Sequence, residues 1–180
     1  MSKADLTIAL DAMGGDHGPE VVIPGAAKAL QERPQALFLF FGERKRIEKV
    51  IGRYKTLERQ SEIHHTDRVV ANDEKPSTAL RKGKDTSMRL AIDAVARGDA
   101  QGVVSAGNTG ALMAMAKMSM KGLPEIHRPA IASVFPTMRG QTVVLDLGAN
   151  IQADSENLAQ YAVLGCVYAR LLFQVSTPRV

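Results

Sequence analysis

The stretch Leu6-Thr-Ile-Ala-Leu-Asp-Ala-Met-Gly-Gly-Asp-His-Gly-Pro19 decides the fold of this chain. Its apolar residues up to Leu10 predict a buried strand that ends at Asp11, and a glycine-rich turn follows. Pro19 suits the first position of a helix, because the N–H group that proline lacks would have no partner there. We therefore expect a strand, a tight turn and a helix that begins at Pro19.

The same alternation of strands and helices continues along the chain. Apolar runs predict further strands over residues 36–41, 63–65, 102–105, 131–135 and 142–147. Helical periodicity predicts helices over residues 19–32, 43–58, 77–97, 111–120 and 155–173, and Gly83 interrupts the third of them. This order is typical of an α/β protein with a mostly parallel sheet and helices on both faces, so the predicted fold is a three-layer α/β/α arrangement.

The composition narrows the class of protein. A chain that is 45% hydrophobic and 23% charged is neither collagen-like nor disordered. A single cysteine, Cys166, excludes an internal disulfide and a cysteine-based zinc site. The modest net charge of +4 and the absence of Trp argue against nucleic acid as a partner. No apolar stretch is long enough to span a membrane, so we expect a cytoplasmic protein.

Three predicted strands end in turns that contain glycine and polar side chains, at residues 11–18, 105–110 and 146–150. Ligands of open α/β sheets bind beyond the carboxyl ends of the strands, and a helix that begins there offers unpaired N–H donors to an anion. A phosphate site is therefore one interpretation and three simple tight turns are the other. The candidate binding residues are Asp11, Gly14, Gly15, Ser105, Gly107, Thr109, Gly110, Asp146 and Asn150. Neither a GxGxxG motif nor a Walker A loop is present, so a nicotinamide or ATP cofactor has no support.

Two further groups of residues carry candidate chemistry. Asp16 and His17 form a carboxylate–imidazole pair in the first turn, and His17 either transfers a proton or only bonds the loop backbone. A basic cluster lies on the predicted helix over residues 77–97, and it is either a solvated face or a contact for an anion or an acidic protein. Its members are Arg81, Lys82 and Lys84.

Three segments resemble, in this order, the signature segments of the phosphate acyltransferase (PlsX) family of bacterial phospholipid synthesis. They are residues 8–19, 105–112 and 145–150. The resemblance implies a fold similar to the isocitrate/isopropylmalate dehydrogenase and phosphotransacetylase group. It also implies an enzyme that moves a fatty acyl group from acyl carrier protein to inorganic phosphate, with no nucleotide cofactor and no required metal. Because members of the family are longer, the chain is expected to be the N-terminal portion of one catalytic domain, truncated after Val180.

The resemblance also suggests roles and partners. Phosphate would be held by the glycine turns together with Ser105, Asn108 and Thr109, with Asn108 as a catalytic residue beside His17 and its orienting Asp16. The basic cluster of Arg81, Lys82 and Lys84 would contact the carrier protein. A homodimer, peripheral association with the inner face of the membrane and a downstream membrane acyltransferase are implied as well. A phosphotransacetylase that uses a coenzyme A thioester, and a non-catalytic module that binds a phosphorylated metabolite, are the alternatives.

Overall fold

The computed structural model describes residues 6–148, 150 and 152–180. It divides the chain into two units, Met1–Lys121 and Gly122–Val180, and each is described by itself. Among the described residues, no helix is long and apolar enough to cross a membrane. The expectation of one catalytic domain stays a prediction.

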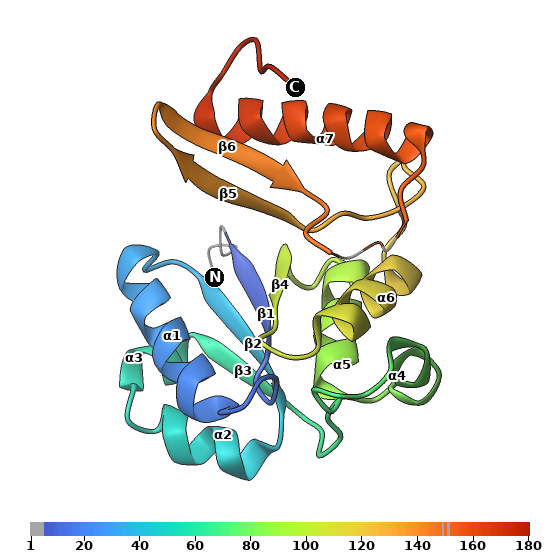
Figure 1. The fold of residues 1–180 in the computed structure, drawn as a ribbon. Coiled ribbons are helices and arrows are strands. Elements are labelled where there is room, and N and C mark those ends of the chain that lie inside the picture. Colours follow the sequence, from blue (N-terminus) through green and yellow to red (C-terminus); the bar gives the residue numbers. More distant parts are fainter. Residues whose placement is uncertain (1–5, 149, 151) are drawn as a thin grey trace. The chain divides into compact units, whose positions relative to one another are not determined.

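The first unit is built on a sheet of four parallel strands in the order β3-β2-β1-β4 (Figure 1). The strands are β1 (Thr7–Asp11), β2 (Leu37–Gly42), β3 (Ser61–His65) and β4 (Gly102–Val104). Leu10 of β1 pairs with Phe40 on one side and with Val104 on the other. Because β1 and β4 are parallel neighbours, the turns that follow them leave the sheet at the same edge.

Helices cover both faces of this sheet (Figure 1). They are α1 (Pro19–Glu32), α2 (Arg44–Ile51), α3 (Lys55–Arg59), α4 (Pro76–Lys82), α5 (Ser87–Arg97) and α6 (Thr109–Ser119). Successive residues of a strand point to opposite faces. Leu10 accordingly packs in one core with Ile23 of α1, whereas Ala9 packs in another with Ala91 of α5. The predicted three-layer α/β/α arrangement is confirmed for this unit.

Two of the predicted helices are each divided, and the interruption that we expected at Gly83 is one of the two breaks. Residues 43–58 form α2 and α3 with a break that begins at Gly52, and residues 77–97 form α4 and α5 with a break that begins at Gly83. A Cβ atom on Gly83 would clash with the carbonyl oxygen of Ala79 in α4 and would lie 2.6 Å from Cε of Met115 in α6, so this position suits glycine. The Thr86 side chain then caps α5 by accepting a hydrogen bond from Arg89 N.

The second unit consists of a β-hairpin and a long helix. β5 (Ala132–Thr137) and β6 (Gly140–Leu145) are antiparallel, and α7 (Ser155–Phe173) packs against β6. These two strands pair as a hairpin, because parallel neighbours need a long crossover and only Met138 and Arg139 connect them. Asp154 caps α7 by accepting a hydrogen bond from Asn157 N at 2.8 Å.

Candidate functional site

A partly buried hydrogen bond ties the first two glycine turns together at the edge of the sheet. Asp11 ends β1 and is 1% exposed. Its Oδ2 atom accepts a hydrogen bond of 2.7 Å from Oγ of Ser105, which follows β4. The same Oγ atom accepts a hydrogen bond of 3.1 Å from the backbone N of Gly107. A buried carboxylate therefore fixes the backbone of both turns.

The glycines of these turns are required by the close approach of the two chains. A Cβ atom on Gly14 would lie 2.6 Å from Asp11 Oδ2 and 2.9 Å from Gly107 N, distances that side chains do not tolerate. Gly15 has a φ of 79°, in the left-handed region that glycine adopts without strain. The two turns meet as they do because neither of these positions carries a side chain.

A pocket of about 570 Å³ opens between the two turns. Its lining consists of Gly15, Asp16, His17, Asn72, Ala106, Gly107, Asn108, Thr109 and Gly110. Because α6 begins at Thr109, the N–H groups of Thr109 and Gly110 precede the first hydrogen bonds within the helix. Unpaired donors at the positive end of a helix dipole suit an anion such as phosphate.

Asn108 anchors a loop beside the pocket. Its Oδ1 atom accepts a hydrogen bond from Ala111 N at 2.9 Å and so caps α6. Its Nδ2 atom donates to the carbonyl oxygens of Asn72 at 2.9 Å and of Glu74 at 2.8 Å. Both amide hydrogens are thus engaged by the loop over residues 71–75, which makes Asn108 a positioning residue in this structure. Its direct part in catalysis stays a prediction.

Asn72 belongs to the site, although the sequence indicated only a polar loop before Pro76. Its Nδ2 atom donates a hydrogen bond of 2.8 Å to Oδ1 of Asp16, so the loop is tied to the first turn as well as to the second. We expected Asp16 to orient His17. Both side chains are exposed and line the pocket, and among the described residues no hydrogen bond joins them. Proton transfer by His17 stays a prediction.

The basic cluster lies at the end of α4 and in the turn that follows. Arg81, Lys82 and Lys84 are exposed, and in residues 6–148 none of them forms an ion pair. The cluster does not line the pocket. Its contact with a partner stays a prediction.

The third turn lies in the second unit, where Asn150 organises a polar cluster. Its Nδ2 atom donates to Oη of Tyr161 at 3.0 Å, to Oδ1 of Asp146 at 3.1 Å and to the carbonyl oxygen of Pro129 at 3.2 Å. Asp146 has a φ of 60°, a conformation that Asp and Asn adopt more readily than other residues with a side chain. Asp146 and Asn150 therefore hold the end of β6 against α7, and their predicted contact with substrate stays a prediction.

Tyr161 makes the stability of this second cluster depend on pH. Burial raises the pKa of Tyr161 above its ordinary value of 10.0, and the charge of Asp146 raises it further. Above pH 10.0 the unfolded chain loses this proton while the folded chain keeps it, so the free energy of unfolding falls as the pH rises. We expect Tyr161→Phe to remove part of this fall, as measured by urea unfolding from neutral to alkaline pH.

The matched control for that measurement is Tyr168→Phe, which changes an exposed tyrosine of the same helix. We expect the control to unfold with the alkaline slope of the unchanged protein. A Tyr161→Phe variant with that same slope would contradict the assignment of the pH dependence to Tyr161.

Comparison with known proteins identifies the family. A family model described as "Fatty acid synthesis protein" matches residues 6–180. The chain belongs to this family. It is 56% identical over 173 residues to a phosphate acyltransferase of Rhodospirillum centenum, covering 96% of this chain and 49% of the relative. It is 52% identical over 176 residues to a phosphate acyltransferase of Brucella anthropi, covering 97% and 50%. The chain thus spans about half the length of the curated relatives it matches.

A solved structure with the same fold supports the fold assignment. A phosphotransacetylase from Streptococcus pyogenes aligns with a TM-score of 0.66 at 18% sequence identity, covering 94% of this chain and 55% of that one. At this identity the likeness concerns the fold alone. The predicted membership of the phosphate acyltransferase family and the predicted fold similar to phosphotransacetylases are both confirmed.

Proposed function

We propose that the chain takes part in the transfer of a fatty acyl group from acyl carrier protein to inorganic phosphate, with acyl phosphate as the product. The observation that carries the proposal is the pocket between the two glycine turns, which exposes the first-turn N–H groups of an eleven-residue helix. The relatives named phosphate acyltransferase and the family described as a fatty acid synthesis protein support it.

The pocket suggests how the reaction proceeds. The N–H groups of Thr109 and Gly110 hold phosphate, with the hydroxyl of Thr109 as a further donor. One phosphate oxygen attacks the thioester carbonyl, so that a C–O bond forms and the C–S bond then breaks. Donors at the pocket stabilise the negative charge that develops on the carbonyl oxygen. The leaving thiolate takes a proton from His17, and His17 regains one from solvent. Because phosphate is itself the nucleophile, no covalent enzyme intermediate is required.

The proposed partners follow from the family resemblance and from charge. Arg81, Lys82 and Lys84 offer an exposed positive surface to an acidic carrier protein. A homodimer, peripheral association with the inner face of the membrane from the cytoplasm, and a membrane acyltransferase that consumes the acyl phosphate complete the proposal.

A phosphotransacetylase that uses a coenzyme A thioester is the second candidate, favoured by the fold of the Streptococcus pyogenes protein. The same pocket would hold phosphate, and the two candidates differ only in the carrier of the acyl group. A non-catalytic phosphate-binding module is the third candidate. Such a module would bind phosphate without any loss of thioester.

Side-by-side assays of the complete gene product separate these functions. One long-chain acyl group is supplied on acyl carrier protein or on coenzyme A, with and without phosphate, while thiol release is followed and acyl phosphate is trapped with hydroxylamine. We expect phosphate-dependent release and hydroxamate formation with the carrier-protein thioester. Faster turnover of the coenzyme A thioester would favour the phosphotransacetylase, and phosphate binding without turnover would favour the binding module.

A further inference from the structure

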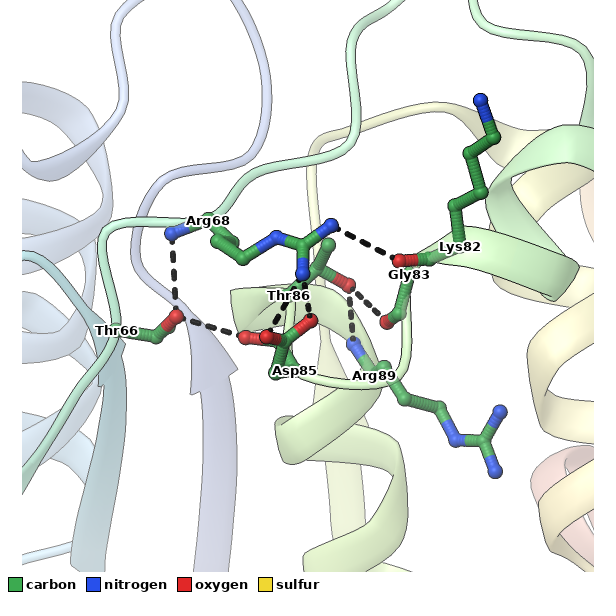
Figure 2. Close-up of polar contacts among 7 residues, drawn as sticks. All are labelled: Thr66, Arg68, Lys82, Gly83, Asp85, Thr86 and Arg89. Carbon is green, nitrogen blue, oxygen red and sulfur yellow. Dashed lines mark hydrogen bonds and ion pairs between the residues drawn. The ribbon is translucent and has the colours of Figure 1, made fainter.

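The turn over residues 82–86, here called the basic turn, is held in place by three side chains (Figure 2). Nη2 of Arg68 donates a hydrogen bond of 3.1 Å to the carbonyl oxygen of Lys82, and its Nη1 lies 2.8 Å from Oδ1 of Asp85. The hydroxyl of Thr66 donates to the Asp85 carbonyl oxygen, and that of Thr86 donates to the Gly83 carbonyl oxygen, each at 2.7 Å. A single guanidinium thus bridges both ends of the basic turn.

This arrangement leaves the cations of the basic turn available to a partner. Figure 2 shows the Lys82 side chain pointing away from the clamped carbonyls, and Lys84 is exposed in the same turn. Asp85 is the acidic residue within the turn, and its carboxylate contacts Arg68 at 2.8 and 2.9 Å. Because Arg68 binds the Asp85 carboxylate, the ammonium groups of Lys82 and Lys84 are available to bind an external anion.

We propose that Arg68 is a positioning residue that holds the basic turn in the shape that docks an acidic protein surface. A preorganised charged surface loses less conformational entropy on binding than a flexible one. An acidic protein, rather than a small anion, fits because the cations project from a turn and do not line the pocket. The proposal rests on the proposed function, in which the acyl donor is carried by an acidic protein.

The test keeps the positive charge at residue 68 and removes only the ability of its side chain to contact Lys82 and Asp85 at the same time. Arg68→Lys retains the positive charge, but an ammonium does not reproduce the planar fork that holds Lys82 and Asp85 together. Arg97→Lys is the matched control, because Arg97 forms a similarly exposed ion pair with Asp99 at 2.8 Å at the end of α5. Binding of fluorescently labelled acyl carrier protein to the complete gene product is measured by anisotropy at low and high ionic strength.

We expect Arg68→Lys to raise the Kd for the carrier protein by about fivefold. The Kd of Arg97→Lys should stay within about twofold of the unchanged protein, and the KM for phosphate should not change in either variant. The proposal would be overturned if the Kd of Arg68→Lys stayed unchanged or if the Kd of Arg97→Lys rose by the same factor. It would also be overturned if the unchanged protein did not bind the carrier protein. The thioester assay is a separate readout, since a protein that binds the carrier without acyl transfer would contradict the proposed function alone.

Discussion

Gly14→Ala is expected to lower the rate of acyl phosphate formation by about a hundredfold, since displacement of a pocket wall by about 1 Å has effects of this size. The added Cβ would lie 2.6 Å from Asp11 Oδ2 and 2.9 Å from both Ser105 Oγ and Gly107 N. All three atoms belong to the contact that joins the two turns, so the turns must separate. Overpacking of this kind also lowers the free energy of unfolding by about 2 kcal/mol, measurable by urea denaturation.

Gly25→Ala provides the matched control for this substitution. Gly25 lies in α1, and a Cβ there has no atom within 4 Å. Because alanine is the better helix former, we expect this variant to be more stable by up to about 1 kcal/mol with an unchanged rate. A Gly14→Ala variant with the rate and stability of the unchanged protein would show that the two turns do not need their close approach.

Asp11→Ala is expected to lower the free energy of unfolding by about 3 kcal/mol, because it leaves a buried and a partly buried donor without an acceptor. The Ser105 hydroxyl loses its bond of 2.7 Å and Met13 N loses its bond of 3.3 Å, both to Asp11. We expect the acyl transfer rate to fall with it, as the Ser105–Gly107 backbone is no longer fixed. Urea unfolding and the thioester assay measure the two effects.

Two variants test whether the loss of stability in Asp11→Ala comes from the hydrogen bonds that Asp11 accepts. Asp67→Ala removes an exposed carboxylate of the same unit, and we expect its stability to stay within about 0.5 kcal/mol of the unchanged protein. Asp11→Asn keeps the shape of the side chain and should cost less than Asp11→Ala. Equal stability of Asp11→Ala and Asp67→Ala would remove the structural role that we assign to Asp11.

The first strand, turn and helix could be predicted because residues close together in the sequence determine them. Pro19 opens α1 as predicted, and the buried strand ends at Asp11. The break that begins at Gly52 was not predicted, because apolar periodicity continues through residues 43–58. The interruption at Gly83 was predicted, but the approach of Met115 from another helix, whose Cε would lie 2.6 Å from a Cβ at that position, was not. Contacts between distant segments leave no local trace in a single sequence.

The site was predicted in part for the same reason. The turns with Asp11, Ser105 and Asn108 could be recognised because their residue types suit anion binding, and the parallel neighbours β1 and β4 bring them together. Asn72 could not be found, since its partner Asp16 lies 56 residues away. Likewise, the sequence suggested Asn108 as a phosphate ligand, but only the fold reveals the carbonyl groups that its amide binds.

The phosphate dependence of acyl phosphate formation in Thr109→Val tests the central claim most directly. Thr109 is exposed in the pocket at the start of α6, so this substitution removes one hydroxyl donor and keeps a branched side chain. Thr56→Val, on the exposed surface of α3, is the control. If the pocket holds the phosphate nucleophile, the KM for phosphate rises about tenfold in Thr109→Val alone, with the KM for the thioester unchanged. An unchanged KM for phosphate, or thiol release that does not require phosphate in the unaltered protein, would contradict the account.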